Sequence, residues 1–233
     1  MVSRRRFLQA SAAAAGLTLT SRSFASAEGC LPMPPSIAKL RSMKDQAKPI
    51  TREERRDRQE KARRLMEANQ LDAILLMEGT SLTYFTGVRW WGGERLFAMV
   101  LPAQGAAFYV CPAFEEDRAR EQLANAPDGA HADVRVWQED DSPYQRVAQG
   151  LKDRGIATGV LGVEEAVRFA FSDGIAKAAP QVKIDSGTPV TAGCRMVKSE
   201  HEVELMRLAA KVTLAAYEAA YRGPQRTTRL TET

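Results

Sequence analysis

The chain has 233 residues, of which 44% are hydrophobic and 27% charged, so it can bury a substantial core. We expect one globular domain with appendages. The net charge of +4 belongs to residues 1–27, which hold four of the 33 basic residues and no acidic one. The rest of the chain therefore carries 29 basic and 29 acidic side chains. This balance gives no electrostatic reason to expect binding to nucleic acid.

The first 27 residues have the three parts of an export signal. A basic segment with Arg4 and Arg5 precedes the small, weakly hydrophobic stretch 10–19, and Ala-Ser-Ala ends at Ala27. The segment resembles a twin-arginine signal peptide, which implies an encounter with the twin-arginine export machinery and cleavage between Ala27 and Glu28. The hydrophobic stretch is short and rich in alanine, so we expect removal after export rather than a permanent membrane anchor. The predicted location is periplasmic or secreted; an ordinary basic tail is the alternative.

The three cysteines indicate no shared site. Cys30, Cys111 and Cys194 are odd in number and scattered, which favours neither a disulfide framework nor a zinc site. Lipid modification of Cys30 is an alternative, although Glu28 fits a lipoprotein signal poorly. We expect Cys111 and Cys194 to be small buried residues.

Residues 28–50 contain four prolines without sustained periodicity and are interpreted as an extended linker. A capping box of Thr51 and Glu54 then predicts a helix that continues to Gln70. Basic residues on this helix alternate with acidic ones, which is typical of a solvated face.

The segment 71–93 organises the rest of the domain. Its apolar run 71–77 predicts a strand buried on both faces, and residues 79–81 predict a turn. Gly87 is expected to take positive φ at a sharp bend. The loop 89–93 is unusually aromatic, so we expect something to cover it.

Strands and helices alternate through the following hundred residues, which predicts an α/β domain with a mixed sheet over residues 51–192. The remaining predicted strands are 96–101 and 106–111, which form a hairpin, then 134–137, 159–163 of the buried kind, and 182–185. The predicted helices are 114–126, 142–154 and 171–179.

A second capping box, Ser199 with Glu202, starts a long helix. Its apolar positions are separated by three or four residues and form one continuous stripe: Val203, Met206, Ala210, Thr213, Tyr217 and Ala220. Such a stripe is expected to pack against a partner. Residues 223–233 show no apolar periodicity and are interpreted as a disordered tail.

Four segments, in their order and spacing, resemble a known family. They are the stretch 71–87 with Tyr84-Phe85-Thr86-Gly87, the hairpin 96–111, the strand 159–164 and above all the run Arg195-Met196-Val197-Lys198-Ser199-Glu200-His201-Glu202. Together they resemble the creatinase/prolidase/aminopeptidase P family. The resemblance implies a ribonuclease H-like N-terminal domain with a mixed sheet. It places the junction and the first helix of a truncated pita-bread domain at residues 193–222.

The family resemblance also implies a chemistry. Its members mostly cleave the bond before proline with two divalent metal ions held by two Asp, one His and two Glu, all in the C-terminal domain. That domain is expected to be missing here, so we predict no metal site, no cofactor in this chain and no activity of the chain alone. His131 and His201 lack spaced partners, and Asp140 and Asp141 are interpreted as loop residues.

The resemblance further implies that the N-terminal domain supports a homo-oligomer and that its loops wall an active site. Tyr84, Arg89, Trp90 and Trp91 are the candidates for this wall, with burial in the core as the alternative. Two functional hypotheses remain. One is a fragment of an exported metallopeptidase, shortened by a frameshift or deliberately, with a peptide substrate only at full length. The other is a stand-alone periplasmic module that binds a peptide or partner.

Overall fold

The computed structural model describes residues 33–91 and 93–222. The predicted signal with Arg4, Arg5, Ala27 and Glu28, the residue Cys30 and the predicted tail lie outside these ranges. The described chain forms two compact units. One consists of residues 43–210, and the other combines residues 33–42 with residues 211–222.

The larger unit is built on a six-stranded mixed sheet with the order β4-β3-β2-β1-β5-β6. The strands are β1 (Ala73–Leu76), β2 (Ala98–Pro102), β3 (Phe108–Pro112), β4 (Asp133–Trp137), β5 (Gly159–Val163) and β6 (Val182–Ser186). The β1, β2 and β3 strands form an antiparallel meander, while β3–β4, β1–β5 and β5–β6 are parallel pairs. In register, Leu75 of β1 lies opposite Val100 on one side and Val163 on the other.

Helices cover both faces of the sheet. They are α3 (Arg52–Ala68), α4 (Thr80–Thr86), α5 (Glu116–Leu123), α6 (Pro143–Asp153), α7 (Phe169–Ala178) and α8 (Thr188–Met196). A further helix, α9 (Glu200–Tyr221), follows α8 and does not belong to this cover. The segments between these elements contain the 3₁₀ turns Lys44–Gln46, Ala113–Glu115 and Gly129–His131. The short helix α2 (Pro35–Ala38) belongs to the smaller unit.

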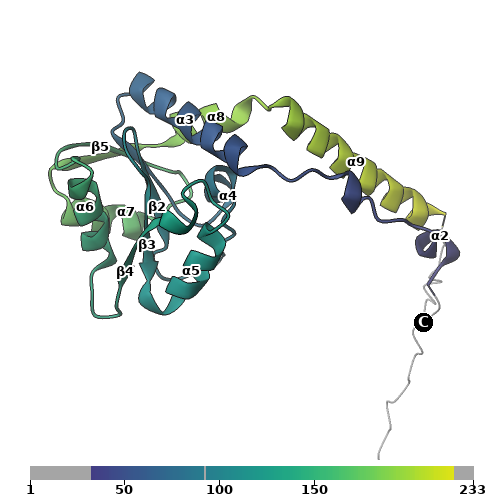
Figure 1. Ribbon diagram of the computed structural model, residues 1–233, viewed down its shortest axis with the longest axis horizontal. Helices are drawn as coiled ribbons and strands as arrows, with labels where there is room; N and C mark the ends of the chain where they lie inside the picture. Colours follow the sequence, from purple (N-terminus) through teal and green to yellow (C-terminus); the bar gives the residue numbers. More distant parts are fainter. Residues whose placement is uncertain (1–32, 92, 223–233) are drawn as a thin grey trace, which may run out of the picture. The chain divides into compact units, whose positions relative to one another are not determined.

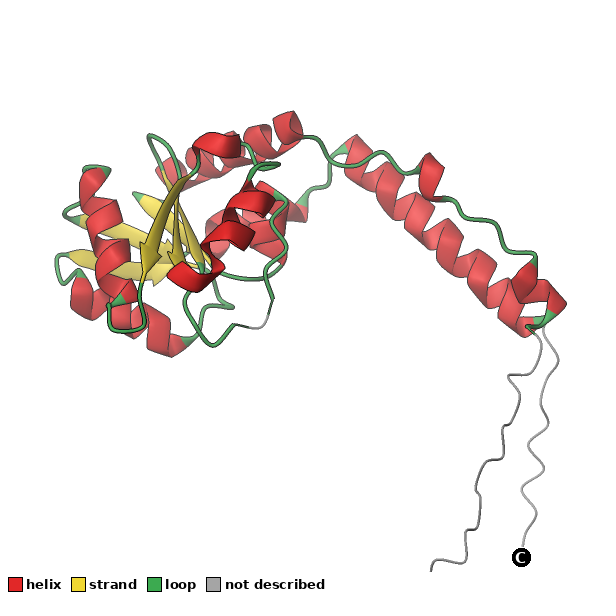
Figure 2. Ribbon diagram, turned by 60° about the horizontal axis from the view of Figure 1, so that its bottom comes forward, coloured by secondary structure: helices red, strands yellow, loops and turns green. Residues whose placement is uncertain are grey.

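The alternation of side chains along β1 divides the core in two. Ile74 and Leu76 face a cluster built with α3, α4, α5 and α8, whereas Ala73 and Leu75 face a cluster built with α6 and α7. Figure 1 shows α6 and α7 on one side of the strands and α5 on the other, and Figure 2 shows the strands enclosed between helices. The predicted mixed α/β fold class is therefore confirmed.

Most predicted elements are present, and the first capping box is confirmed. Thr51 Oγ1 accepts a hydrogen bond from the backbone N of Glu54 at 3.1 Å, and Glu54 Oε2 accepts one from the backbone N of Thr51 at 2.7 Å. The predicted hairpin corresponds to β2 and β3. The β5 strand is less buried than expected, because it lies beside the edge strand β6. Of its five residues, only Leu161 and Gly162 are buried.

Three segments differ from the sequence-based expectation. The predicted turn at 79–81 is instead the start of α4, a seven-residue helix bounded by Gly79 at φ 141° and Gly87 at φ 82°. The positive φ expected at Gly87 is confirmed. The helix α8 was not predicted, and the expected extended linker contains α2 and the first 3₁₀ turn.

The long helix after the second capping box is α9. Glu202 Oε2 accepts a hydrogen bond from the backbone N of Ser199 at 2.8 Å, and Ser199 Oγ accepts one from the backbone N of Glu202 at 3.2 Å, which confirms the box. Its predicted apolar stripe is largely exposed, with Met206 57% and Tyr217 71% accessible. Among the described residues, no helix is both long enough and apolar enough to cross a membrane.

Candidate functional site at the start of helix α9

The four residues predicted to form a wall do not lie together. Trp90 is only 2% exposed and stacks on Phe97 with ring centroids 3.9 Å apart. The guanidinium of Arg118 covers its ring at 4.1 Å. Trp90 is therefore a core residue and is not available to line a surface.

The two neighbours of Trp90 in the chain remain on the surface. Trp91 is 71% exposed, and Arg89 is exposed while its backbone N donates a hydrogen bond to Gln122 Oε1 at 2.7 Å. The cover expected over this loop is thus present for Trp90 and absent for Trp91 among the described residues. Tyr84 lies elsewhere, on α4, where it faces the start of α9.

Tyr84 belongs to a polar cluster that joins α3, α4, α8 and α9. Arg58 Nη2 donates a hydrogen bond to Glu202 Oε1 at 2.7 Å, and Arg58 Nη1 donates one to the carbonyl of Tyr84 at 2.9 Å. The Arg58 guanidinium also lies 4.0 Å from the centroid of the Tyr84 ring. The Tyr84 hydroxyl in turn donates a hydrogen bond to the carbonyl of Cys194 at 3.0 Å.

Burial governs the electrostatics of this cluster. The side chains of Arg58 and Glu202 are only 13% and 14% exposed. Burial raises the pKa of the Tyr84 phenol, and the charge of Glu202 raises it further. The phenol therefore stays protonated at neutral pH and serves as a hydrogen-bond donor.

Basic side chains hold the last turn of α8. Lys61 Nζ donates a hydrogen bond to the carbonyl of Cys194 at 3.0 Å, and Lys198 Nζ donates one to the carbonyl of Arg195. Helix carbonyls at a C-terminus lack intrahelical partners and carry a partial negative charge, which cations stabilise. Arg195 itself reaches Ser81 Oγ at 3.3 Å. The end of α8 is thus held by Lys61 of α3 and, through Arg195, by Ser81 of α4.

A pocket of about 330 Å³ opens beside the cluster. Side chains of both charges line it, namely Glu54, Asp57, Arg58, Lys61, Arg64, Lys198 and Glu202, together with Tyr84, Cys194, Val197 and Ser199. Such a lining offers hydrogen-bond donors and acceptors to a polar ligand. It provides no histidine or cysteine side chain arranged with carboxylates as a metal ligand set.

The described residues do not fit a two-metal centre. Within residues 33–91 and 93–222, no three His, Cys, Asp or Glu side chains gather where they could hold a metal ion. His131 is exposed in a 3₁₀ turn. Asp140 is exposed, and Asp141 accepts hydrogen bonds from Arg146 Nη2 at 2.9 Å and the backbone N of Gln138 at 3.2 Å.

His201 has a more specific place than its sequence indicates. Its ring nitrogens lie 2.7 Å from Glu54 Oε1 and 3.0 Å from the carbonyl oxygen of Lys48. The structure shows a bridge from α9 to α3 rather than an isolated histidine. No local motif identifies this pairing, because His201 and Glu54 are 147 residues apart in the chain.

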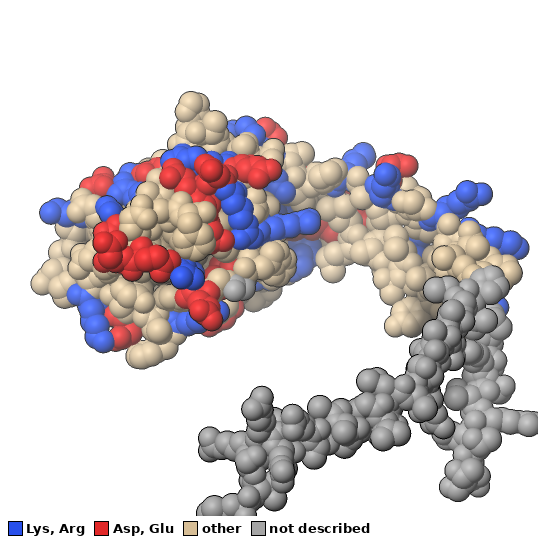
Figure 3. Space-filling model, turned by 90° about the horizontal axis from the view of Figure 1, so that it is seen from below, with Lys and Arg blue, Asp and Glu red and all other residues tan. Residues whose placement is uncertain are grey.

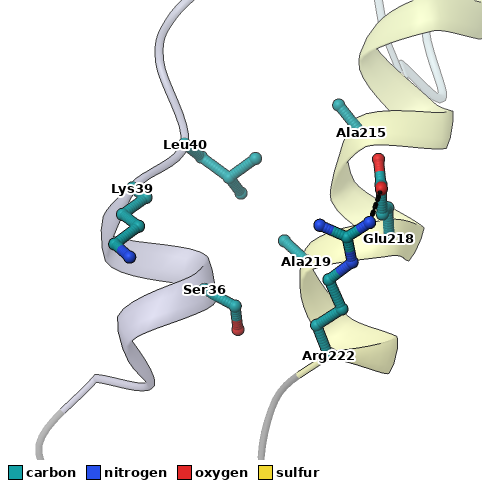
Figure 4. Close-up of a pocket in the computed structure, with 7 residues that line it drawn as sticks. All are labelled: Ser36, Lys39, Leu40, Ala215, Glu218, Ala219 and Arg222. Carbon is teal, nitrogen blue, oxygen red and sulfur yellow. Dashed lines mark ion pairs between the residues drawn. The ribbon is translucent and has the colours of Figure 1, made fainter.

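The smaller unit contains a separate pocket of about 380 Å³. Figure 4 shows Ser36, Lys39 and Leu40 on one side and residues of α9 on the other. At the end of α9, Arg222 Nη2 pairs with Glu218 Oε1 at 2.5 Å. The lining contains one carboxylate, Glu218, and no histidine or cysteine, so it offers no catalytic pair and no set of metal ligands.

The charges on the surface of the larger unit are mixed. In the view of Figure 3, basic and acidic side chains are interspersed over the domain. This distribution agrees with the equal numbers of basic and acidic residues after position 27.

The six-stranded mixed sheet with helices on both faces defines an α/β domain. Glu202, through its cap and its ion pair with Arg58, attaches the first turn of α9 to this domain. The chain belongs to the Creatinase/Prolidase N-terminal domain family, whose pattern matches residues 58–197. This match includes the whole sheet and ends just before the capping box of α9.

Several relatives support this assignment. The chain is 26% identical over 171 residues to the ectoine hydrolase of Halomonas elongata, covering 70% of this chain and 43% of the relative. It is 31% identical over 141 residues to the probable dipeptidase PepE of Mycobacterium tuberculosis, covering 60% and 35%. The crystal structure of a dipeptidase from Pyrococcus horikoshii superposes with a TM-score of 0.60 and 26% identity, covering 70% and 43%. The chain thus matches less than half the length of each of these proteins.

Proposed function

We propose that this chain supplies the N-terminal domain of an exported Xaa-Pro dipeptidase- or aminopeptidase-like metallopeptidase and does not hydrolyse peptides by itself. The observation that carries the proposal is the family membership of residues 58–197, combined with a described chain that gathers no metal-ligand group. Two divalent metal ions of such an enzyme would be bound outside the described residues. The relative named Xaa-Pro dipeptidase, from Pyrococcus horikoshii, supports the Xaa-Pro substrate class.

The role we propose for the domain is oligomerisation or walling of an active site. Trp91 supports this role because 71% of a large aromatic side chain faces solvent, and tryptophan and arginine dominate the energetics of protein interfaces. Arg89 lies two residues before it and is also exposed. These two residues, rather than Trp90, are the surface candidates in the loop.

Peptidase activity is tested with purified protein loaded with Mn²⁺ or Co²⁺ and an X-Pro dipeptide. We expect no release of proline above the protein-free control. A full-length prolidase in the same assay shows that the metal and substrate are competent. Hydrolysis by this chain that a chelator abolishes would overturn the proposal.

Oligomerisation is tested with Trp91→Ala and, as the matched control, Trp90→Ala. Sedimentation measures the mass and thermal unfolding measures the stability of each variant. We expect Trp91→Ala to lower the oligomer mass more than the melting temperature, because an exposed side chain contributes little to folding. A Trp91→Ala protein with unchanged mass would remove the interface role from this residue.

Export is proposed from residues 1–27, with Arg4 and Arg5 as the recognition pair. Fusion of this segment to a folded reporter should place the reporter in the periplasm, and replacing both arginines by lysine should retain it in the cytoplasm. N-terminal sequencing of the exported protein should begin at Glu28. Export that survives the double replacement would point to another route.

A stand-alone periplasmic binding module is the second candidate, and the pocket of about 330 Å³ beside Arg58 and Tyr84 favours it. Its lining of both charges would suit the zwitterionic ends of a short peptide. Calorimetric titration with dipeptides distinguishes the two functions. Binding that Arg58→Gln weakens would favour the module, whereas no heat of binding leaves the domain role as the better supported one.

A further inference from the structure

His201 is held between two groups that can only accept hydrogen bonds. Its Nδ1 lies 2.7 Å from Glu54 Oε1, and its Nε2 lies 3.0 Å from the carbonyl oxygen of Lys48. A neutral imidazole has a single N–H and could donate to only one of them, while the imidazolium donates to both. The geometry therefore matches the doubly protonated ring.

The carboxylate partner is fixed by its own helix. Glu54 Oε2 accepts a hydrogen bond from the backbone N of Thr51 at 2.7 Å within the capping box, and Oε1 remains for His201. Both oxygens of Glu54 thus face donors, which suits the ionised form. Because the capping box fixes this side chain, the acceptor is already in place when His201 becomes protonated.

A second attachment lies one residue further along α9. Glu202 joins Arg58 through Oε1 at 2.7 Å and the backbone N of Ser199 through Oε2 at 2.8 Å. The first turn of α9 is therefore held to α3 by this ion pair and by the contact of His201 with Glu54.

We propose that His201 is a proton-dependent clamp that ties the first turn of α9 to the start of α3 and to the segment before it. The clamp is closed when the ring is an imidazolium, and it loses one of its two hydrogen bonds when the ring becomes neutral. The attachment of the start of α9 to the α/β domain then depends on pH. All of the contacts lie within the larger unit, residues 43–210. None of them takes part in the proposed peptidase activity, so the clamp does not rest on that proposal.

The charged groups around the ring favour the closed form. The hydrogen bond to Glu54 raises the pKa of His201, partial burial opposes it, and the charges of Glu54 and Glu204 add to the rise. For Glu54, burial acts to raise the pKa, but hydrogen bonds from Thr51 and His201 outweigh it and lower the pKa.

The two shifts define a pH window. The raised pKa of His201 gives stabilisation that is fully present below about 6.5, its value in an unfolded chain, and lost as the pH rises through the folded value. The lowered pKa of Glu54 gives stabilisation that is present above about 4.3 and lost as the pH falls through its folded value. The clamp is thus strongest in the mildly acidic range between them.

The clamp is tested by NMR titration of the ¹⁵N-labelled full chain, which has two histidines. Long-range ¹H–¹⁵N spectra report which ring nitrogens carry protons, and a His131→Gln variant assigns the signals to His201. We expect both ring nitrogens of His201 to be protonated at pH 6, and we expect Glu54→Gln to move its titration to lower pH. A neutral ring at pH 6, or a titration that Glu54→Gln leaves in place, would overturn the proposal.

Hydrogen exchange tests the consequence for the helix. After correction for intrinsic rates, we expect protection of the amides at 204–206 to fall about two- to tenfold as His201 deprotonates, the effect of one hydrogen bond on a local equilibrium. His201→Gln should make this protection independent of pH, while the matched variant Glu204→Gln should keep the dependence. Protection that stays constant in the wild type, or that falls equally in His201→Gln, would refute the clamp.

Discussion

Removing the Arg58–Glu202 ion pair should destabilise the domain more than a surface ion pair would. Exposed pairs contribute about 0–1 kcal/mol, whereas breaking a buried pair costs about 3–5 kcal/mol. The exposure of 13% and 14% places this pair near the buried limit. Arg58→Ala also removes the hydrogen bond to the Tyr84 carbonyl and the contact with the Tyr84 ring, so we expect a loss of about 3–4 kcal/mol.

The pairwise part of this energy requires a double-mutant cycle. Urea unfolding at pH 7 of the wild type, Arg58→Ala, Glu202→Gln and the double variant gives the coupling free energy, which we expect to be about 1–2 kcal/mol. The exposed pair of Lys177 and Asp173, with N and O 2.6 Å apart, is the matched control and should couple by at most about 0.5 kcal/mol. Equal coupling in the two pairs would show that water screens Arg58 and Glu202 as effectively as a surface pair.

Three further changes test the packing. Trp90→Ala should lower the free energy of unfolding by about 3–5 kcal/mol in urea, because it removes a buried ring stacked on Phe97. Gly150→Ala should cost about 1–3 kcal/mol in the same measurement despite the better helix former, since a Cβ there would lie 2.3 Å from the Phe108 ring; unchanged stability would contradict this close packing. Burial raises the pKa of Cys111 to about 12 and also raises that of Cys194, so a Cys30→Ser variant should react with a thiol reagent at pH 8 only after unfolding.

The elements that sequence analysis located correctly are those whose patterns are local. The apolar run that became β1 is buried on both faces in the middle of the sheet, which is why it lacks alternation. The capping boxes at Thr51 and Ser199 involve residues three positions apart, so they were visible in the sequence. In contrast, α4 was not predicted, because the glycines at its two ends resemble those of a turn. A helix of seven residues is stabilised by its burial against α3 rather than by a local pattern that the sequence shows.

The candidate site could be predicted only in part, for a reason of distance along the chain. The sequence singled out Tyr84 through the family resemblance and Glu202 through its capping box. Neither signal revealed that Arg58 joins them, because Arg58 is 26 residues from Tyr84 and 144 from Glu202. Trp90 and Trp91 illustrate the same limit, since adjacent residues of one type have opposite environments that only the packing of Phe97 decides.

Glu202 couples the start of α9 to the attachment of this helix to α3. One of its oxygens caps the helix and the other pairs with Arg58, so a single side chain both starts α9 and attaches it to α3. A helix that began elsewhere would lose the attachment, and a domain without Arg58 would weaken the cap by leaving a buried carboxylate unpaired. The start of the helix and its attachment to the domain are therefore coupled. His201 can then adjust how firmly the first turn is held without changing where the helix begins.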